Sequence, residues 1–367
     1  MPRVPLSGWR RTDLSRFFSD KFQNLTPYTP GEQPKDTQYI KLNTNESPFS
    51  PTPNALRMAS EAAKQLQLYS DPECRDLVKI AAQRFQVEED EILFTNGSDE
   101  ILNFAFMAFC DQDHPAVFPD ITYGFYKVFA ALNGVPYEQI PLAEDFTIKV
   151  EEYCGINKTI VIANPNAPTG IALTTEQIEQ IIKTNPNNVV IIDEAYVDFG
   201  GQSVIPLIHK YDNLLVTGTF SKSRSLAGGR LGFGIGCKAL IQDLNTMKYA
   251  TNPYNVNRMT MAAGVGTLMD ECEVQENCRK IMEVREWTTQ QLKALGFTLT
   301  DSKANFVFAS HPKVDGKKIY LRLKEKGVLI RHFDTPRLRA YNRITIGSSR
   351  QMQIFMEKLK EVLEELL

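Results

Sequence analysis

The stretch LLVTGTFSKSRSLAGGR, residues 214–230, joins a buried-strand pattern to a turn of unusual chemistry. Its first seven residues form the continuous apolar run that is typical of a strand covered on both faces of a parallel sheet. Similar runs lie at TIVIA (159–163) and NVVIID (188–193), and helical patterns such as TTEQIEQIIK (174–183) separate them. Strands that alternate with helices in this way predict an α/β fold with a mostly parallel sheet.

The same texture extends outward on both sides of this stretch. Upstream, EILFT (91–95) and PAVFPD (115–120) read as strands on either side of the helix SDEILNFAFMAFC (98–110). Downstream, RLGFGIG (230–236) reads as one more strand. We therefore predict one large domain over residues 46–256, built around this sheet.

Beyond about residue 256 the pattern changes to a long helical segment followed by short strands. FTLT, NFVFAS, VLIRHF and NRITIG are strand candidates, DGKKIYLRLKEKG is a helix, and residues 349–367 have the apolar spacing of an amphipathic helix. This predicts a smaller α/β domain over residues 257–367. Residues 1–45, rich in Pro, Thr and Asn, are expected to form an arm that partly joins the small domain, with a short helix within TDLSRFFSDKF (12–22).

The composition excludes several classes of protein. The chain has 367 residues, 43% of them hydrophobic, and a net charge of -3, so it lacks the basic excess of a nucleic-acid binder. The six cysteines include no CxxC pair and only four histidines are present, which argues against a disulfide framework, a metal centre or a Ser-His-Asp site. No secretory or membrane segment is recognisable, so we expect a cytoplasmic protein that handles small molecules.

Ligands of open α/β sheets bind at the carboxyl ends of the strands, where this chain carries unusual residues. After EILFT comes Asn96-Gly97-Ser98-Asp99-Glu100, a turn into a helix whose free N–H groups favour a phosphate; an ordinary helix cap is the alternative. NVVIID ends in Asp193, a carboxylate that is costly in a buried strand unless it meets a cation such as a protonated pyridine nitrogen. Tyr196, three residues on, can reach the same ring, although the tetrapeptide also fits a surface turn.

The turn after LLVTGTF contains the reactive candidate. Lys222 stands at a strand end beside Ser221, where a lysine can form a Schiff base with an aldehyde. Arg230, eight residues later, is suited to clamp a phosphate together with Ser221, whereas Arg224 is expected on a basic surface loop. A Pro/Gly turn, NPNAPTG (164–170), follows TIVIA and either closes over a site or reverses the chain.

These motifs, in this order, resemble the fold-type I pyridoxal-phosphate aminotransferases, and most closely the histidinol-phosphate aminotransferase family. The resemblance covers nearly the whole chain from Thr26 onward. The segments that carry it are LNTNESPFSPTP (42–53), YSDPE (69–73), NGSDE (96–100), NPNAPTG, DEAY (193–196), TFSKSRSLAGGRLG (219–232), PYNVN (253–257) and VLIRHFDTPRL through YNRITIG (328–347).

The resemblance implies two groups of site residues and no metal. In the cofactor group, Lys222 is the Schiff-base lysine, Asp193 is the partner of the pyridinium nitrogen and Tyr196 bonds the ring hydroxyl. The remaining cofactor residues comprise the stacking Tyr123, the phosphate ligands Ser98, Asp99, Ser221 and Arg230, and Thr219, Asn166 and Tyr69. The substrate group consists of the anion-binding Arg331 and Arg343, the overlying Tyr28 and, from the neighbouring subunit of a homodimer, Tyr69.

One departure from the family pattern concerns the Pro/Gly turn. The family usually has Asn before Pro-Thr-Gly, where the amide donates to the ring hydroxyl, but this chain has Ala167. Either Tyr196 makes that contact alone or Asn166 adjusts to help. Gly229 is a smaller departure, since a bulkier apolar residue is common there.

The implied activity is pyridoxal 5'-phosphate-dependent transamination of histidinol phosphate with 2-oxoglutarate, which gives imidazole acetol phosphate and glutamate in histidine biosynthesis. The cofactor acts as electron sink, and Lys222 serves as general base and acid in a ping-pong cycle. An aromatic amino-acid aminotransferase and a threonine-phosphate decarboxylase remain alternatives, because related enzymes of both kinds use similar residues. A pyridoxal-phosphate-sensing transcription regulator would need a DNA-binding domain for which only about 40 residues are available here.

Overall fold

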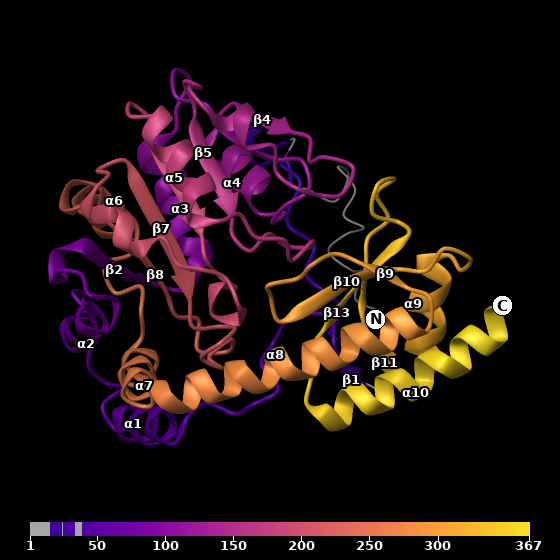
Figure 1. Ribbon diagram of the computed structural model, residues 1–367. Coiled ribbons are helices and arrows are strands. Elements are labelled where there is room, and N and C mark those ends of the chain that lie inside the picture. Colours follow the sequence, from indigo (N-terminus) through magenta and orange to yellow (C-terminus); the bar gives the residue numbers. More distant parts are fainter. Residues whose placement is uncertain (1–14, 24, 34–38) are drawn as a thin grey trace.

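The computed structural model describes residues 15–23, 25–33 and 39–367 of the chain. These residues form a larger α/β unit around a seven-stranded sheet and a smaller unit around a four-stranded sheet (Figure 1). The long helix α8, Glu271–Ala294, extends from the larger unit along the smaller one. The predicted domain boundaries at residues 46 and 257 stay a proposal.

The large sheet is mostly parallel, as the apolar runs predict. Its strand order is β2-β8-β7-β6-β5-β3-β4, and only β8 runs antiparallel to its neighbours. The strands are β2 (Ile92–Thr95), β3 (Ala116–Pro119), β4 (Tyr137–Ile140), β5 (Thr159–Ala163), β6 (Val190–Asp193), β7 (Leu214–Thr219) and β8 (Gly232–Gly236).

Both faces of this sheet are buried. Alternate residues of the central strands belong to two different hydrophobic clusters, one on each face. In β5, Ile160 and Ile162 pack into one cluster, while Val161 and Ala163 pack into the other. One face is covered by α1 (Pro53–Ala63), α2 (Arg75–Phe85), α5 (Thr175–Thr184) and α7 (Arg258–Met269). The other is covered by α3 (Ser98–Phe109), α4 (Tyr126–Asn133) and α6 (Lys238–Thr251).

The smaller unit packs helices against an antiparallel sheet of order β12-β13-β10-β9. Its strands are β9 (Thr298–Leu299), β10 (Phe306–Ser310), β12 (Arg331–His332) and β13 (Tyr341–Thr345). Helices α8, α9 (Gly316–Glu325) and α10 (Ser349–Leu366) bury their apolar residues in one shared core.

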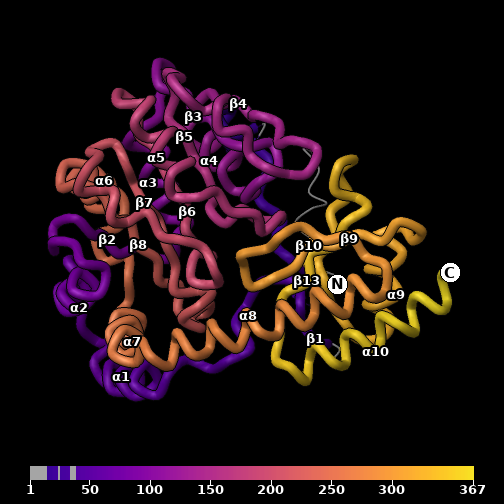
Figure 2. The backbone as a smooth tube through the Cα atoms, viewed as in Figure 1, coloured from indigo at the N-terminus to yellow at the C-terminus, as the bar shows by residue number. Residues whose placement is uncertain are grey.

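The chain before α1 is tied to the smaller unit. Strand β1, Ile40–Lys41, pairs in parallel with β11, Val328–Leu329, and lies among the orange and yellow segments in Figure 2. As a result, the predicted strand VLIRHF is split: β11 pairs with the N-terminal segment, and β12 pairs with β13.

Two other expectations come out differently or stay open. Within the predicted helix 12–22, the described residues contain only a short 3-10 turn at Asp20–Phe22, and residues 12–14 lie outside the described part of the chain. Among the described residues, no helix has the length and apolar character of a membrane span. The cytoplasmic location stays a prediction.

Candidate active site

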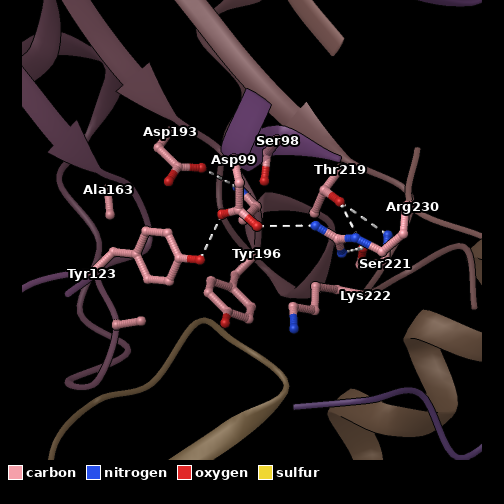
Figure 3. Close-up of a pocket in the computed structure, with 12 residues that line it drawn as sticks. Ser98, Asp99, Tyr123, Ala163, Asp193, Tyr196, Thr219, Ser221, Lys222 and Arg230 are labelled. Atoms are coloured by element: carbon pink, nitrogen blue, oxygen red, sulfur yellow. Dashed lines mark hydrogen bonds and ion pairs between the residues drawn. The ribbon is translucent and has the colours of Figure 1, made fainter. Parts of the chain in front are cut away.

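A pocket opens at the carboxyl ends of the central parallel strands, where the chemistry-bearing turns meet. The side chains point into it from the turns after β2, β5, β6 and β7 and from the segment after β3 (Figure 3). The lining residues are Ser98, Asp99, Tyr123, Ala163, Ala167, Asp193, Ala195, Tyr196, Thr219, Ser221, Lys222 and Arg230.

One end of the pocket is suited to an anion. Helix α3 begins at Ser98, so the N–H groups of its first turn and its dipole face this end. Gly97, the residue before the helix, has φ +79, and a Cβ there would lie 2.4 Å from Nη2 of Arg230. A Cβ on Gly232 would likewise lie 2.3 Å from the backbone N of Ser98. Glycine at both positions therefore lets the arginine and strand β8 close against the helix N-terminus.

Polar contacts fix the side chains around this anion site. Asp99 accepts from Tyr123 at 2.7 Å and forms an ion pair with Arg230 at 2.9 Å. The hydroxyls of Thr219 and Ser221 are 3.0 Å apart, and Nη1 of Arg230 lies 3.5 Å from Oγ of Ser221. The half-exposed guanidinium is thus held between Asp99 and Ser221 with part of its surface free.

Asp193 is a buried carboxylate at the end of β6. It accepts from the Tyr126 hydroxyl at 2.8 Å and from the backbone N–H of Ala195 at 3.2 Å. Burial raises the pKa of Asp193 to about 6, although these hydrogen bonds act in the opposite direction. No cationic side chain among the described residues forms an ion pair with it, so the carboxylate is placed to receive a cation from the pocket.

Lys222 lines the pocket from the turn after β7. Its Nζ lies 5.8 Å from the centre of the Tyr196 ring and 3.3 Å from the backbone oxygen of Thr44. The Tyr196 hydroxyl accepts from Nδ2 of Asn45 at 2.9 Å. The segment that contains Thr44 and Asn45 therefore forms part of the wall beside the lysine.

A second cavity adjoins the first and carries two arginines. It shares Tyr123, Ala167, Tyr196 and Lys222 with the first pocket, and it is also lined by Tyr28, Phe333, Arg331 and Arg343. Arg331 of β12 and Arg343 of β13 are direct cross-strand partners. Arg343 donates to the backbone oxygen of Asn43 at 3.1 Å, while its Nε has no partner among the described residues. Two like charges in one pair are unfavourable unless an anion joins them.

Tyr28 reaches this second cavity from the N-terminal segment. Its ring stacks on Phe125 at a centroid distance of 4.3 Å and lies 6.2 Å from the ring of Tyr123. Burial raises the pKa of the Tyr28 hydroxyl, whereas Arg343 and Arg331 act to lower it. The hydroxyl therefore stays protonated at neutral pH and close to both arginines.

Two residues of the predicted site are not brought to either cavity. Asn166 is buried, and its amide nitrogen donates to the backbone oxygen of Ile121 at 3.0 Å and to the Thr169 hydroxyl at 3.1 Å. Its neighbour Ala167 lines the pocket instead. Tyr69 is 81% exposed and stacks on Tyr254 at 4.7 Å.

One expectation about the lysine turn is wrong. Arg224 is not a surface residue: it is buried, pairs with Asp198 at 2.8 Å and lies 5.2 Å from the centre of the Phe220 ring. Burial of this guanidinium is tolerated because a carboxylate compensates the charge. The arginine thereby anchors the turn that presents Lys222.

Sequence reasoning also missed two residues that hold the site in place. Tyr126 bonds Asp193, and Asn45 bonds Tyr196. Asn45 lies within LNTNESPFSPTP, a segment whose resemblance to the family was recognised without a role for this residue. Tyr126 gave no signal, since a tyrosine at the start of a helix is usually read as a core residue.

Comparison with known proteins places the chain in a family. Residues 37–359 match the model described as "Aminotransferase class I and II". The chain belongs to this family. It is also 47% identical to the histidinol-phosphate aminotransferase of Brachyspira hyodysenteriae over 96% of this chain and 100% of the relative, and 46% identical to that of Clostridium beijerinckii over 95% and 98%.

Solved structures agree with the fold. The histidinol-phosphate aminotransferase of Sinorhizobium meliloti, solved in complex with pyridoxal-5'-phosphate, superposes with a TM-score of 0.86 over 97% of this chain and 100% of its own, at 23% identity. The predictions of a fold-type I architecture and of an aminotransferase are therefore confirmed.

Proposed function

We propose that this aminotransferase transfers the amino group of histidinol phosphate to 2-oxoglutarate, using pyridoxal 5'-phosphate. The observation that carries the proposal is the cross-strand pair Arg331 and Arg343, which faces a cavity continuous with the Lys222 pocket. Relatives more than 40% identical over nearly the whole chain are named histidinol-phosphate aminotransferase. The products are imidazole acetol phosphate and glutamate, as expected for a step of histidine biosynthesis.

The first pocket fits two polar features of the cofactor, its phosphate and its ring nitrogen. The N-terminus of α3, Ser221 and Arg230 offer N–H, hydroxyl and guanidinium donors to its phosphate. Asp193, buried without a cationic partner among the described residues, suits its protonated ring nitrogen. When bound, the cofactor withdraws electrons from the substrate α-carbon and carries the amino group between the two substrates.

In the proposed reaction Lys222 transfers the proton, and Tyr196 forms a hydrogen bond with the ring hydroxyl of the cofactor. Lys222 is the only lysine among the lining residues of the first pocket, and its flexible stem lets the amine take a proton from the substrate α-carbon and return it nearby. Asp193 would stabilise the positive charge on the ring nitrogen of the cofactor while Lys222 transfers the proton. Tyr123 lies against the same pocket, with its hydroxyl held by Asp99.

The arginine pair accounts for two chemically different substrates. Histidinol phosphate has a phosphate and no α-carboxylate, whereas glutamate and 2-oxoglutarate carry carboxylates. A guanidinium fork binds either kind of anion. Tyr28, close to both arginines, adds a hydroxyl donor on the side of the N-terminal segment.

We also propose that the enzyme acts as a homodimer in which Tyr69 completes the site of the other subunit. The support is the exposure of Tyr69 together with neighbouring apolar side chains: Leu66 and Leu68 are more than half exposed, and Tyr254 stacks on Tyr69. Exposed apolar patches of this kind mark interaction surfaces.

The activity is tested with purified protein supplied with the cofactor. Histidinol phosphate and 2-oxoglutarate together should yield glutamate, and omission of either substrate should abolish it. A matched preparation of the Lys222→Ala variant serves as control. Absence of glutamate formation from protein that has bound the cofactor would refute the proposed substrate pair.

A further inference from the structure

The Tyr196 hydroxyl has a neighbour that fixes the direction of its proton. Nδ2 of Asn45 lies 2.9 Å from the hydroxyl oxygen, and an amide nitrogen can only donate. The tyrosine oxygen is therefore the acceptor in this bond, and its own proton is left to point elsewhere. Tyr196 lines the Lys222 pocket, so a donor is available toward a ligand bound there.

The oxygen of the Asn45 amide faces Thr345 of β13. Oδ1 of Asn45 accepts from the Thr345 hydroxyl at 3.0 Å, and the backbone N–H of Asn45 donates to Oγ1 of Thr345, also at 3.0 Å. With its oxygen engaged on Thr345, the amide presents its nitrogen to Tyr196. Both Asn45 and Thr345 are buried, so water does not compete for these bonds.

The backbone at Asn45 is held in place as well. Asn45 has φ 56, in the left-handed region that asparagine tolerates better than most residues. Its carbonyl oxygen accepts from Nδ2 of the fully buried Asn305 at 3.0 Å. Thr345 of β13 and Asn305, the residue directly before β10, thus hold Asn45 beside a tyrosine that follows β6 of the large sheet.

The turn that carries Ala167, which packs in the same hydrophobic cluster as Tyr196, explains why the bond from Asn45 to Tyr196 matters. Ala167 lines the pocket and has no side-chain donor. The amide nitrogen of Asn166 is already committed to Ile121 and Thr169. Tyr196 is thus left without help from this turn in donating to a phenolic oxygen, and the direction of its single proton becomes decisive.

We infer that Asn45 is a positioning residue that directs the Tyr196 proton toward the ring hydroxyl of the bound cofactor, and that Thr345 sets the amide for this purpose. The inference rests on the proposed cofactor site. A donor on that oxygen stabilises its deprotonated form. Loss of Asn45 should therefore raise the midpoint of the cofactor's visible pH titration.

The experiment follows the absorbance of the holoenzyme from acid to alkaline pH without substrate. Asn45→Ala and Thr345→Val should shift the midpoint upward by about 0.5 to 1 pH unit, the size expected for one hydrogen bond. Asn45→Asp should shift it at least as far, because a carboxylate accepts the tyrosine proton instead of directing it to the pocket. Thr345→Ser keeps the hydroxyl and should leave the midpoint unchanged.

A double-mutant cycle separates this role from simple packing. In a Tyr196→Phe background, the further change Asn45→Ala should move the midpoint no more, since no tyrosine proton remains to be directed. Equal shifts in both backgrounds, or an unchanged midpoint in folded Asn45→Ala and Asn45→Asp holoenzymes, would overturn the inference. Failure of the unaltered protein to acquire a visible band would instead count against the proposed cofactor site.

Discussion

Arg331 and Arg343 lie directly opposite each other on strands β12 and β13, so two guanidinium groups occupy one cross-strand pair. Arg343 stands 5.3 Å and Arg331 5.5 Å from the centres of the Phe306 and Phe333 rings, respectively. Neither arginine forms an ion pair with a carboxylate of the described residues. The pair is therefore a local cost to the fold that an anionic substrate would relieve.

Replacement of either arginine should weaken the use of histidinol phosphate while sparing the cofactor. A charge-assisted hydrogen bond contributes roughly 1.5–3 kcal/mol, so Arg343→Gln or Arg331→Gln should lower kcat/KM by about one to two powers of ten. Thermal stability should stay equal or rise, because the like-charge contact is removed. Arg339→Gln, at an exposed position outside the cavity lining, is the matched control. Unchanged kcat/KM in both variants would remove the arginines from the substrate site.

The cofactor linkage should map to a single lysine. Borohydride reduction of the holoenzyme followed by peptide mapping should place the label on Lys222, the lysine that lines the pocket beside Tyr196. Lys222→Ala should lose the reducible visible band yet still bind the cofactor through Arg230 and Asp193. A label on any other lysine contradicts the assignment.

Asp193 should make the stability of the cofactor-free protein depend on pH. Its pKa is raised from 3.8 to about 6 by burial, so the folded state holds the proton more tightly than the unfolded state does. This favourable contribution is complete below about pH 4 and is lost as pH rises through 6, at a cost of about 3 kcal/mol. Asp193→Asn should therefore stabilise the apoprotein at pH 8, with a gain that vanishes near pH 4.

The same substitution should lower the thermal stability of the holoenzyme, because a neutral amide does not compensate the charge of a protonated ring nitrogen. Melting curves of both forms at the two pH values give the test. An Asp193→Asn apoprotein that is less stable than the parent at pH 8 would show that the buried, ionised carboxylate does not destabilise the fold. Tyr126→Phe, which removes the hydrogen bond to Asp193, should raise the pKa of Asp193 further and enlarge the loss of stability at high pH.

The dimer proposal predicts complementation between two defective chains. Mixed Lys222→Ala and Tyr69→Phe subunits form hybrids in which one site has both the lysine and the partner's tyrosine. With random exchange, about a quarter of the sites should be intact. If activity does not exceed that of the unmixed Tyr69→Phe protein despite demonstrated subunit exchange, each site is built within one chain.

The sequence was sufficient for the framework of the site because local patterns determine it. TIVIA coincides with β5, LLVTGTF agrees with β7 to within one residue, and the turns after these strands converge as expected for a mostly parallel sheet. Residues adjacent to strand ends, such as Asp193 and Lys222, were accessible to this reasoning. The fold class could be read without knowing any long-range contact.

Contacts between distant segments were not accessible in the same way. Asn45 and Tyr196 are 151 positions apart, and the hydrogen bond between them depends on how the N-terminal segment pairs with the small sheet. Arg224 reads as a surface charge until its partner Asp198, 26 positions earlier, is brought beside it. Asn166 looks like a pocket residue until its amide is seen to be engaged by Ile121 and Thr169.

The central claim is that histidinol phosphate is the amino donor and that the paired arginines bind its phosphate. Values of kcat/KM for histidinol phosphate, histidine, phenylalanine and tyrosine, measured with 2-oxoglutarate as acceptor, test it most directly. Histidinol phosphate should exceed each amino acid by at least about tenfold, the amount that one charge-assisted contact provides. A higher value for phenylalanine or tyrosine would contradict the account and identify the enzyme as an aromatic amino-acid aminotransferase.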